Sequence, residues 1–146
     1  EIAGEDFSDV ELVHRTSAGT QGVVRARSAS VLLTASFCCA NATVRYLKKL
    51  KAKSVSFVIT GITGDGRGDE DTACADYLSR LLNGENVRSE SYLDRVRNSV
   101  NARILAEAPI SSPEDLDYCC ALDRVDFAMR VEKTHEGLIL KKIVMI

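Results

Sequence analysis

Val55-Ser56-Phe57-Val58-Ile59-Thr60 is a β-branched and nearly continuous apolar run in the middle of the chain. Such a run is typical of a strand that is buried on both faces, as in a parallel sheet. A glycine-rich loop at residues 61–68 follows it, and residues 71–82 show the apolar spacing of a helix. A strand buried on both faces needs helices on either side, so this stretch predicts an α/β fold.

Two similar units precede this stretch. Residues 10–15 and 31–35 read as strands, and residues 23–27 and 41–51 read as the helices that follow them. Strands that alternate with helices are joined by right-handed crossovers and form a parallel sheet. The first half of the chain therefore predicts a parallel or mostly parallel sheet covered by helices.

The second half has a different pattern. Residues 89–108 suggest one long helix, which Pro109 ends, and Ser112 caps a further helix that should extend to about Leu122. Residues 127–132 and 138–143 read as two strands around His135-Glu136-Gly137, which predicts a C-terminal β-hairpin.

Composition narrows the classes of function. The 146 residues suit a single α/β domain spanning residues 1–146. The net charge of −2 gives no excess of positive charge that would indicate nucleic-acid binding. The apolar runs are too short to span a bilayer, so no membrane partner is expected. Because the sequence begins with Glu1, we expect a processed chain or a piece of a longer protein.

The cysteines favour a reducing compartment. Their number is odd, two pairs are vicinal, and no Cys-x-x-Cys occurs, which argues against a disulfide framework and against structural zinc. We expect free thiols that act as small buried hydrophobes in a cytoplasmic protein. The residues concerned are Cys38, Cys39, Cys74, Cys119 and Cys120.

Thr16-Ser17-Ala18-Gly19-Thr20-Gln21-Gly22 lies between a predicted strand and a predicted helix. Glycines allow close approach of an oxyanion to the backbone, and the free N–H groups of a helix start attract it. The stretch is neither a Walker loop nor the dinucleotide fingerprint. It predicts an anion cradle, with a plain turn and a Ser/Thr cap as the alternative.

Three loops should meet at one edge of the predicted sheet, where ligands bind in open parallel sheets. They are residues 16–21, 36–41 and 60–71, and Arg15 and Arg67 adjoin them as anion candidates. Asp69-Glu70-Asp71 begins a helix, so these acids either complement the helix dipole or hold Mg²⁺ beside substrate phosphate.

In order, these motifs resemble the 2-phosphosulfolactate phosphatase family. The resemblance covers residues 12–84 well and continues more loosely to the end of the chain. Family members are magnesium-dependent acid phosphatases with an α/β fold, and their known role is in coenzyme M biosynthesis. The matching segments are residues 16–24, Ala35-Ser36-Phe37, Asn41-Ala42, residues 58–61 and residues 70–78.

The resemblance implies roles for particular residues. Glu70 and Asp71 would hold Mg²⁺ and serve catalysis, and Asn41 would orient a substrate oxygen. A phosphorylated 2-hydroxy acid would be the substrate, with its phosphate cradled by Thr16, Ser17, Ala18, Gly19 and Thr20.

The chain also departs from the family pattern. An active-site segment that the family carries in its first half is absent, so the chain resembles the C-terminal half, and the missing N-terminal half would be a partner. A non-catalytic phosphate-binding or subunit-association domain is the alternative. A homo-oligomer is left open, because the long helix from Ser89 could pair.

Overall fold

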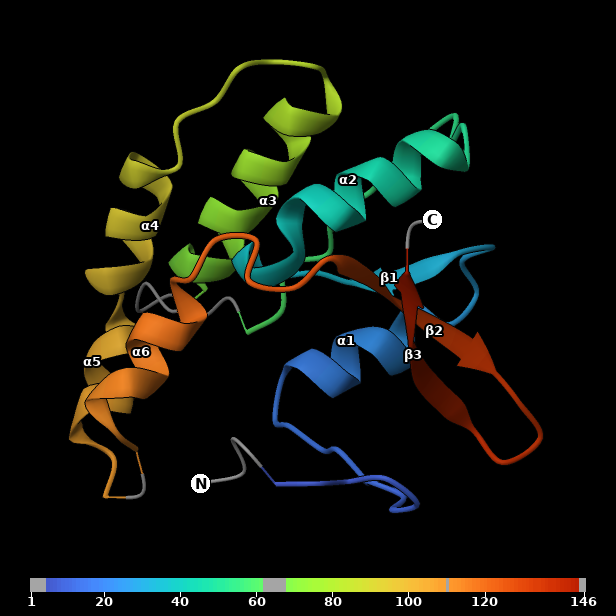
Figure 1. Ribbon diagram of the computed structural model, residues 1–146, viewed down its shortest axis with the longest axis horizontal. Helices are drawn as coiled ribbons and strands as arrows, with labels where there is room; N and C mark the ends of the chain where they lie inside the picture. The colour runs from blue at the N-terminus through green and yellow to red at the C-terminus, as the bar shows by residue number, and fades with distance from the viewer. Residues whose placement is uncertain (1–4, 62–67, 110, 145–146) are drawn as a thin grey trace.

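The computed structural model describes residues 5–61, 68–109 and 111–144. Figure 1 shows helices α4, α5 and α6 at one end of the molecule and the sheet at the other, with α2 and α3 between them. Within the described residues, no helix is long and apolar enough to cross a membrane.

The sheet has three strands in the order β1-β2-β3, and both pairings are antiparallel. The strands are β1 (Leu32–Thr34), β2 (Phe127–Lys133) and β3 (Leu138–Val144). The turn between β2 and β3 is closed by a 2.8 Å hydrogen bond from the Thr134 N–H to the Gly137 carbonyl. Gly137 has a φ of 138°, which a residue with a side chain rarely adopts. The predicted C-terminal hairpin is confirmed.

The predicted parallel sheet is wrong. Residues 10–15 and 55–60 form no strand, and β1 pairs with the C-terminal hairpin instead. No side chain of residues 55–60 is fully buried, and Val58 is 62% exposed. An apolar run indicates that a segment will be buried. It does not determine which neighbouring segment will form backbone hydrogen bonds with it.

Four of the helices lie close to where the sequence predicted helical segments. The bounds are α1 (Gly19–Arg25), α2 (Ala40–Lys49), α3 (Asp69–Leu82) and α6 (Pro113–Cys119), with a short 3₁₀ turn η1 (Phe37–Cys39) before α2. The remaining helices are α4 (Glu90–Arg97) and α5 (Val100–Glu107).

The single helix predicted over residues 89–108 is wrong, because it is divided between α4 and α5. Ser99 is in extended conformation at the break, and its Oγ accepts a 3.0 Å hydrogen bond from the Ala102 N–H. A serine at this position satisfies an N–H group that the first turn of a helix otherwise leaves unpaired. The division of the helix turns α5 toward the start of α3.

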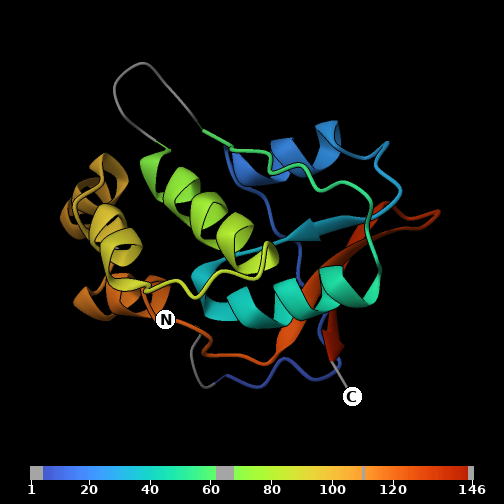
Figure 2. The ribbon, with the colours of Figure 1, turned by 90° about the horizontal axis from the view of Figure 1, so that it is seen from above.

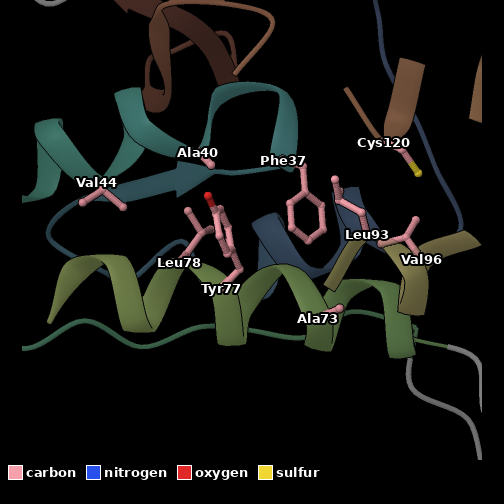
Figure 3. Packing of buried hydrophobic residues seen from close by; sticks show 9 residues of the cluster. All are labelled: Phe37, Ala40, Val44, Ala73, Tyr77, Leu78, Leu93, Val96 and Cys120. Carbon is pink, nitrogen blue, oxygen red and sulfur yellow. The ribbon is translucent and has the colours of Figure 1, made fainter. Parts of the chain in front are cut away.

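The main core lies between α2, α3, α4 and the turn after α6 (Figure 3). Phe37 and Tyr77 form its centre, with ring centroids 5.6 Å apart at a tilted angle. Phe57 packs against this cluster from residues 55–60. The core therefore fixes α3, the helix that begins with the acidic residues.

All five cysteines are free thiols. Cys39 and Cys120 are buried as expected, and Cys38 and Cys74 are half-buried. Cys119 is exposed, so the expectation of burial is wrong for that residue. It lies at the end of α6, on a short helix that packs through its other face.

Candidate functional site

The start of α3 is set by Gly68, which has a φ of 93° and turns the chain into the helix. The Thr72 N–H and Oγ1 both donate to the Gly68 carbonyl, at 3.0 and 2.9 Å. This turn places three consecutive carboxylates, Asp69, Glu70 and Asp71, in the first helical turn. Their negative charge is favourable there because it faces the positive end of the helix dipole.

Each of the three carboxylates is held by a different part of the chain. Arg95 on α4 donates to Asp69 Oδ1 at 2.7 Å. Asn101 on α5 donates from Nδ2 to Glu70 Oε1. Thr60 donates from Oγ1 to Asp71 Oδ2 at 3.1 Å.

These partners divide the acids into two kinds. Asp69 has an ion pair with Arg95, so its charge is balanced within the fold. Glu70 and Asp71 receive hydrogen bonds only from neutral groups among the described residues. The charge of Glu70 acts unfavourably on ionised Asp71, and a positively charged ligand near both carboxylates would relieve that repulsion.

The burial of the two carboxylates makes their negative charge more costly, which favours binding of a cation. Burial raises the pKa of Asp71 above its usual value, the hydrogen bond from Thr60 lowers that pKa, and the charge of Glu70 raises it again. Glu70 Oε2 is buried and has no hydrogen-bond partner among the residues that the structure describes. An ionised oxygen buried without a partner is costly, and a bound cation would remove that cost.

The donor set fits Mg²⁺, which binds oxygen ligands and often uses one or two carboxylates together with substrate phosphate and water. Within the described part of the chain, no three His, Cys, Asp or Glu side chains gather as a ready metal site. A metal bound by Glu70 and Asp71 would therefore need other ligands besides these two carboxylates, such as water or substrate phosphate.

The Thr16–Gly22 stretch forms a turn followed by α1, which begins at Gly19. Thr16 and Thr20 bond to each other: the Thr20 N–H donates to Thr16 Oγ1 at 3.0 Å, and the Thr16 N–H donates to Thr20 Oγ1 at 3.1 Å. These two N–H groups are occupied by hydroxyls of the loop itself. Part of the loop therefore follows the alternative prediction, in which Ser/Thr hydroxyls cap the turn. The role of the loop as an anion cradle stays a prediction.

The same stretch contacts the segment that leads to the acids. A Cβ on Gly22 would overlap the Thr60 methyl group, and one on Gly61 would lie 3.4 Å from Ala18 Cβ. Figure 2 shows α1 beside the green segment that ends at residue 61. Because Thr60 also bonds to Asp71, the structure brings the turn before α1 and the start of α3 together.

Asn41 is engaged elsewhere. Its N–H and Nδ2 donate to the two carboxylate oxygens of Asp123, at 2.7 and 2.6 Å. No hydrogen bond within the described residues joins Asn41 to Glu70, Asp71 or the Thr16–Gly22 stretch. Its predicted role in orienting substrate stays a prediction. Of the two anion candidates, Arg15 is exposed and Arg67 lies outside the described residues, as do residues 62–66 of the glycine-rich loop.

A surface cavity of about 410 Å³ lies between α3 and α4, away from these groups. Its two guanidinium groups are already paired, Arg80 with Glu85 and Arg95 with Asp69 and Asp76. Its lining includes neither Glu70 nor Asp71. This cavity is therefore not part of the candidate site.

Sequence reasoning did not single out Asn101 or Arg95. Each is distant in sequence from the acid it contacts, and each lies on a helix of ordinary amphipathic pattern. The position of Ser99 as a helix cap was the available signal, since it would have shown that residues 100–107 change direction.

The family model for 2-phosphosulpholactate phosphatase matches residues 1–134. The chain therefore belongs to the 2-phosphosulfolactate phosphatase family. It is 28% identical over 147 residues to a protein of Bacillus subtilis (strain 168) named probable 2-phosphosulfolactate phosphatase. The match covers 99% of this chain and 64% of that relative, so the chain spans less than two thirds of the relative's length. No solved structure matches the chain.

Proposed function

We propose that this chain carries the metal-binding part of a phosphatase that hydrolyses phosphate monoesters of 2-hydroxycarboxylic acids, with 2-phosphosulfolactate as the reference substrate. The observation that carries the proposal is the pair Glu70 and Asp71, whose hydrogen-bond partners among the described residues are neutral although Glu70 Oε2 is buried. Membership of the family and the name of the Bacillus subtilis relative support the reaction class.

In this proposal Glu70 and Asp71 hold Mg²⁺. The metal would neutralise phosphate charge and orient or activate the attacking water. Thr60 orients Asp71 by donating to its Oδ2, and in this proposal the carboxylate binds the cation in that orientation. Without a cation the two carboxylates would repel a phosphate ester, so metal and substrate binding are coupled.

The turn before α1 is proposed to receive the phosphate. Ser17, Ala18 and Gly19 lie at the start of α1, where the positive end of the helix dipole favours an anion. Gly19 is the first residue of the helix, so its N–H has no partner within it. Thr16 and Thr20 fix the shape of this turn through their reciprocal hydrogen bonds.

The test is release of inorganic phosphate from a panel of phosphorylated 2-hydroxy acids, with and without Mg²⁺, by the wild type and Asp71→Asn. We expect Mg²⁺-dependent release that falls at least tenfold in the variant. Asp94→Asn is the matched control, because Asp94 is an exposed acid on α4 paired with Arg97. Release that is unaffected by chelation of Mg²⁺, or by Asp71→Asn, would contradict the proposal.

A non-catalytic phosphate-binding domain is the second candidate. It is favoured by the small donor set, because no three His, Cys, Asp or Glu side chains gather as a metal site within the described residues. This alternative predicts that the protein binds inorganic phosphate in a calorimetric titration but hydrolyses no ester of the panel, so the two measurements separate the candidates.

A further inference from the structure

We propose that Asn101 is a positioning residue that orients the Glu70 carboxylate toward the cation, a role that rests on the proposed function. Asn101 lies in the first turn of α5, and its Nδ2 donates to Glu70 Oε1. The second oxygen, Oε2, is buried and has no hydrogen-bond partner in the described part of the chain. One oxygen is therefore fixed by the fold while the other is left for a ligand.

The position of Asn101 depends on the break between α4 and α5. Ser99 is 4% exposed, and its Oγ caps the helix two residues before Asn101. The buried cap fixes the first turn of α5 and thereby the direction in which Asn101 projects. The hydrogen bond to Glu70 in turn joins α5 to the start of α3, 31 residues away in sequence.

The chemistry of the amide suits this task better than a charged donor would. An NH₂ group can hold a carboxylate oxygen without neutralising it, so Glu70 keeps its full charge for a cation. The neighbouring Asp69 shows the contrast, since its partner is the guanidinium of Arg95. Partners that orient metal-binding carboxylates without touching the metal typically change metal affinity by about 10- to 100-fold when they are removed.

Calorimetric titration with Mg²⁺ tests this inference on Asn101→Ala, Glu70→Gln and the double variant. Alanine favours the helix, so the fold should be kept; Asn101→Leu, which fills the volume and excludes a replacement water, is the second variant. We expect Asn101→Ala to weaken Mg²⁺ binding about tenfold. In the Glu70→Gln background the same change should have no further effect, because the carboxylate that Asn101 orients is gone.

Asn98→Ala is the matched control, since Asn98 Nδ2 donates to the Asp94 carbonyl and not to a carboxylate. Wild-type affinity in both folded Asn101 variants would overturn the inference. An equal loss in the wild-type and Glu70→Gln backgrounds would also overturn it, because it would show a structural effect. Failure of the wild type itself to bind Mg²⁺ would refute the proposed function, and the inference with it.

Discussion

At the scale of single residues, the contacts of the acids decide which of them can serve a ligand. Three consecutive carboxylates look equivalent in sequence, and helix capping would explain all of them. The structure separates them, because Asp69 meets a guanidinium whereas Glu70 and Asp71 meet an amide and a hydroxyl. Glu70 and Asp71 are candidates for the site because no described residue balances their charge. The presence of acidic residues alone would not distinguish them from Asp69.

Gly22 provides a test of the contact between α1 and residue 60. Gly22→Ala should lower the free energy of unfolding by about 1–3 kcal/mol, because the new methyl group overlaps Thr60 Cγ2. Adding Thr60→Ser removes that methyl group but keeps the hydroxyl that bonds to Asp71, so it should restore most of the loss. Urea denaturation of both variants measures this. A double variant no more stable than Gly22→Ala would contradict the described contact.

Cys74 gives a prediction for alkaline pH. Burial, together with smaller contributions from nearby Cys39 and Asp71, raises the pKa of its thiol from 9.0 to about 12. As the pH rises above 9, the unfolded chain loses this proton and the folded chain keeps it, so stability falls. We expect the stability advantage of the wild type over Cys74→Ala to shrink by up to about 1.4 kcal/mol per pH unit between pH 9 and 12. An advantage that does not change with pH would contradict a buried neutral thiol.

At the scale of helices and strands, the sequence located most segments but not their partners. Residues 40–49 and 69–82 were predictable because their apolar side chains repeat with helical spacing. The hairpin was predictable because a turn separates two apolar runs. The sequence could not show whether residues 55–60 pair with another strand, since side-chain burial does not specify which segment supplies the adjacent strand.

The same limit applies to the candidate site. Proximity of the Thr16–Gly22 stretch to Asp71 was expected from a sheet edge that does not exist, yet Thr60 brings the two segments together. The contact of Asn101 with Glu70 depends on the break at Ser99, which the long apolar stripe of residues 89–108 obscured. Long-range contacts made by short polar side chains leave no periodic signal.

Ser99 tests the break between α4 and α5. Ser99→Ala should lower the free energy of unfolding by about 1 kcal/mol, because it leaves the Ala102 N–H unpaired in a buried position. Ser89→Ala is the matched control, since Ser89 precedes α4 without a capping hydrogen bond from its side chain. Equal effects of the two changes in urea denaturation would show that Ser99 does not cap α5.

At the scale of the whole molecule, a polar clamp joins α2 to the segment before the hairpin. Asp123 accepts two hydrogen bonds from Asn41, and its own N–H donates to the Phe37 carbonyl at 2.9 Å. Asp123 has a φ of 50°, an uncommon conformation that these bonds hold in place. This clamp fixes the sheet relative to the helices that carry the acids.

Asn41→Ala separates a structural role from a role in substrate binding. We expect it to lower the free energy of unfolding by about 1 kcal/mol through loss of the side-chain bond to Asp123. The KM for a phosphorylated hydroxy acid and the affinity for Mg²⁺ should be unchanged at temperatures where the variant is folded. A raised KM in a fully folded variant would instead show that Asn41 contacts substrate.

Calorimetric Mg²⁺ titration of the wild type, Glu70→Gln, Asp71→Asn and the control Asp94→Asn tests whether the two acids bind a cation. We expect the wild type and the control to bind Mg²⁺ equally, and each of the two site variants to bind at least about tenfold more weakly while keeping its thermal stability. Equal affinity in all four proteins would show that Glu70 and Asp71 hold no metal and only complement the helix dipole.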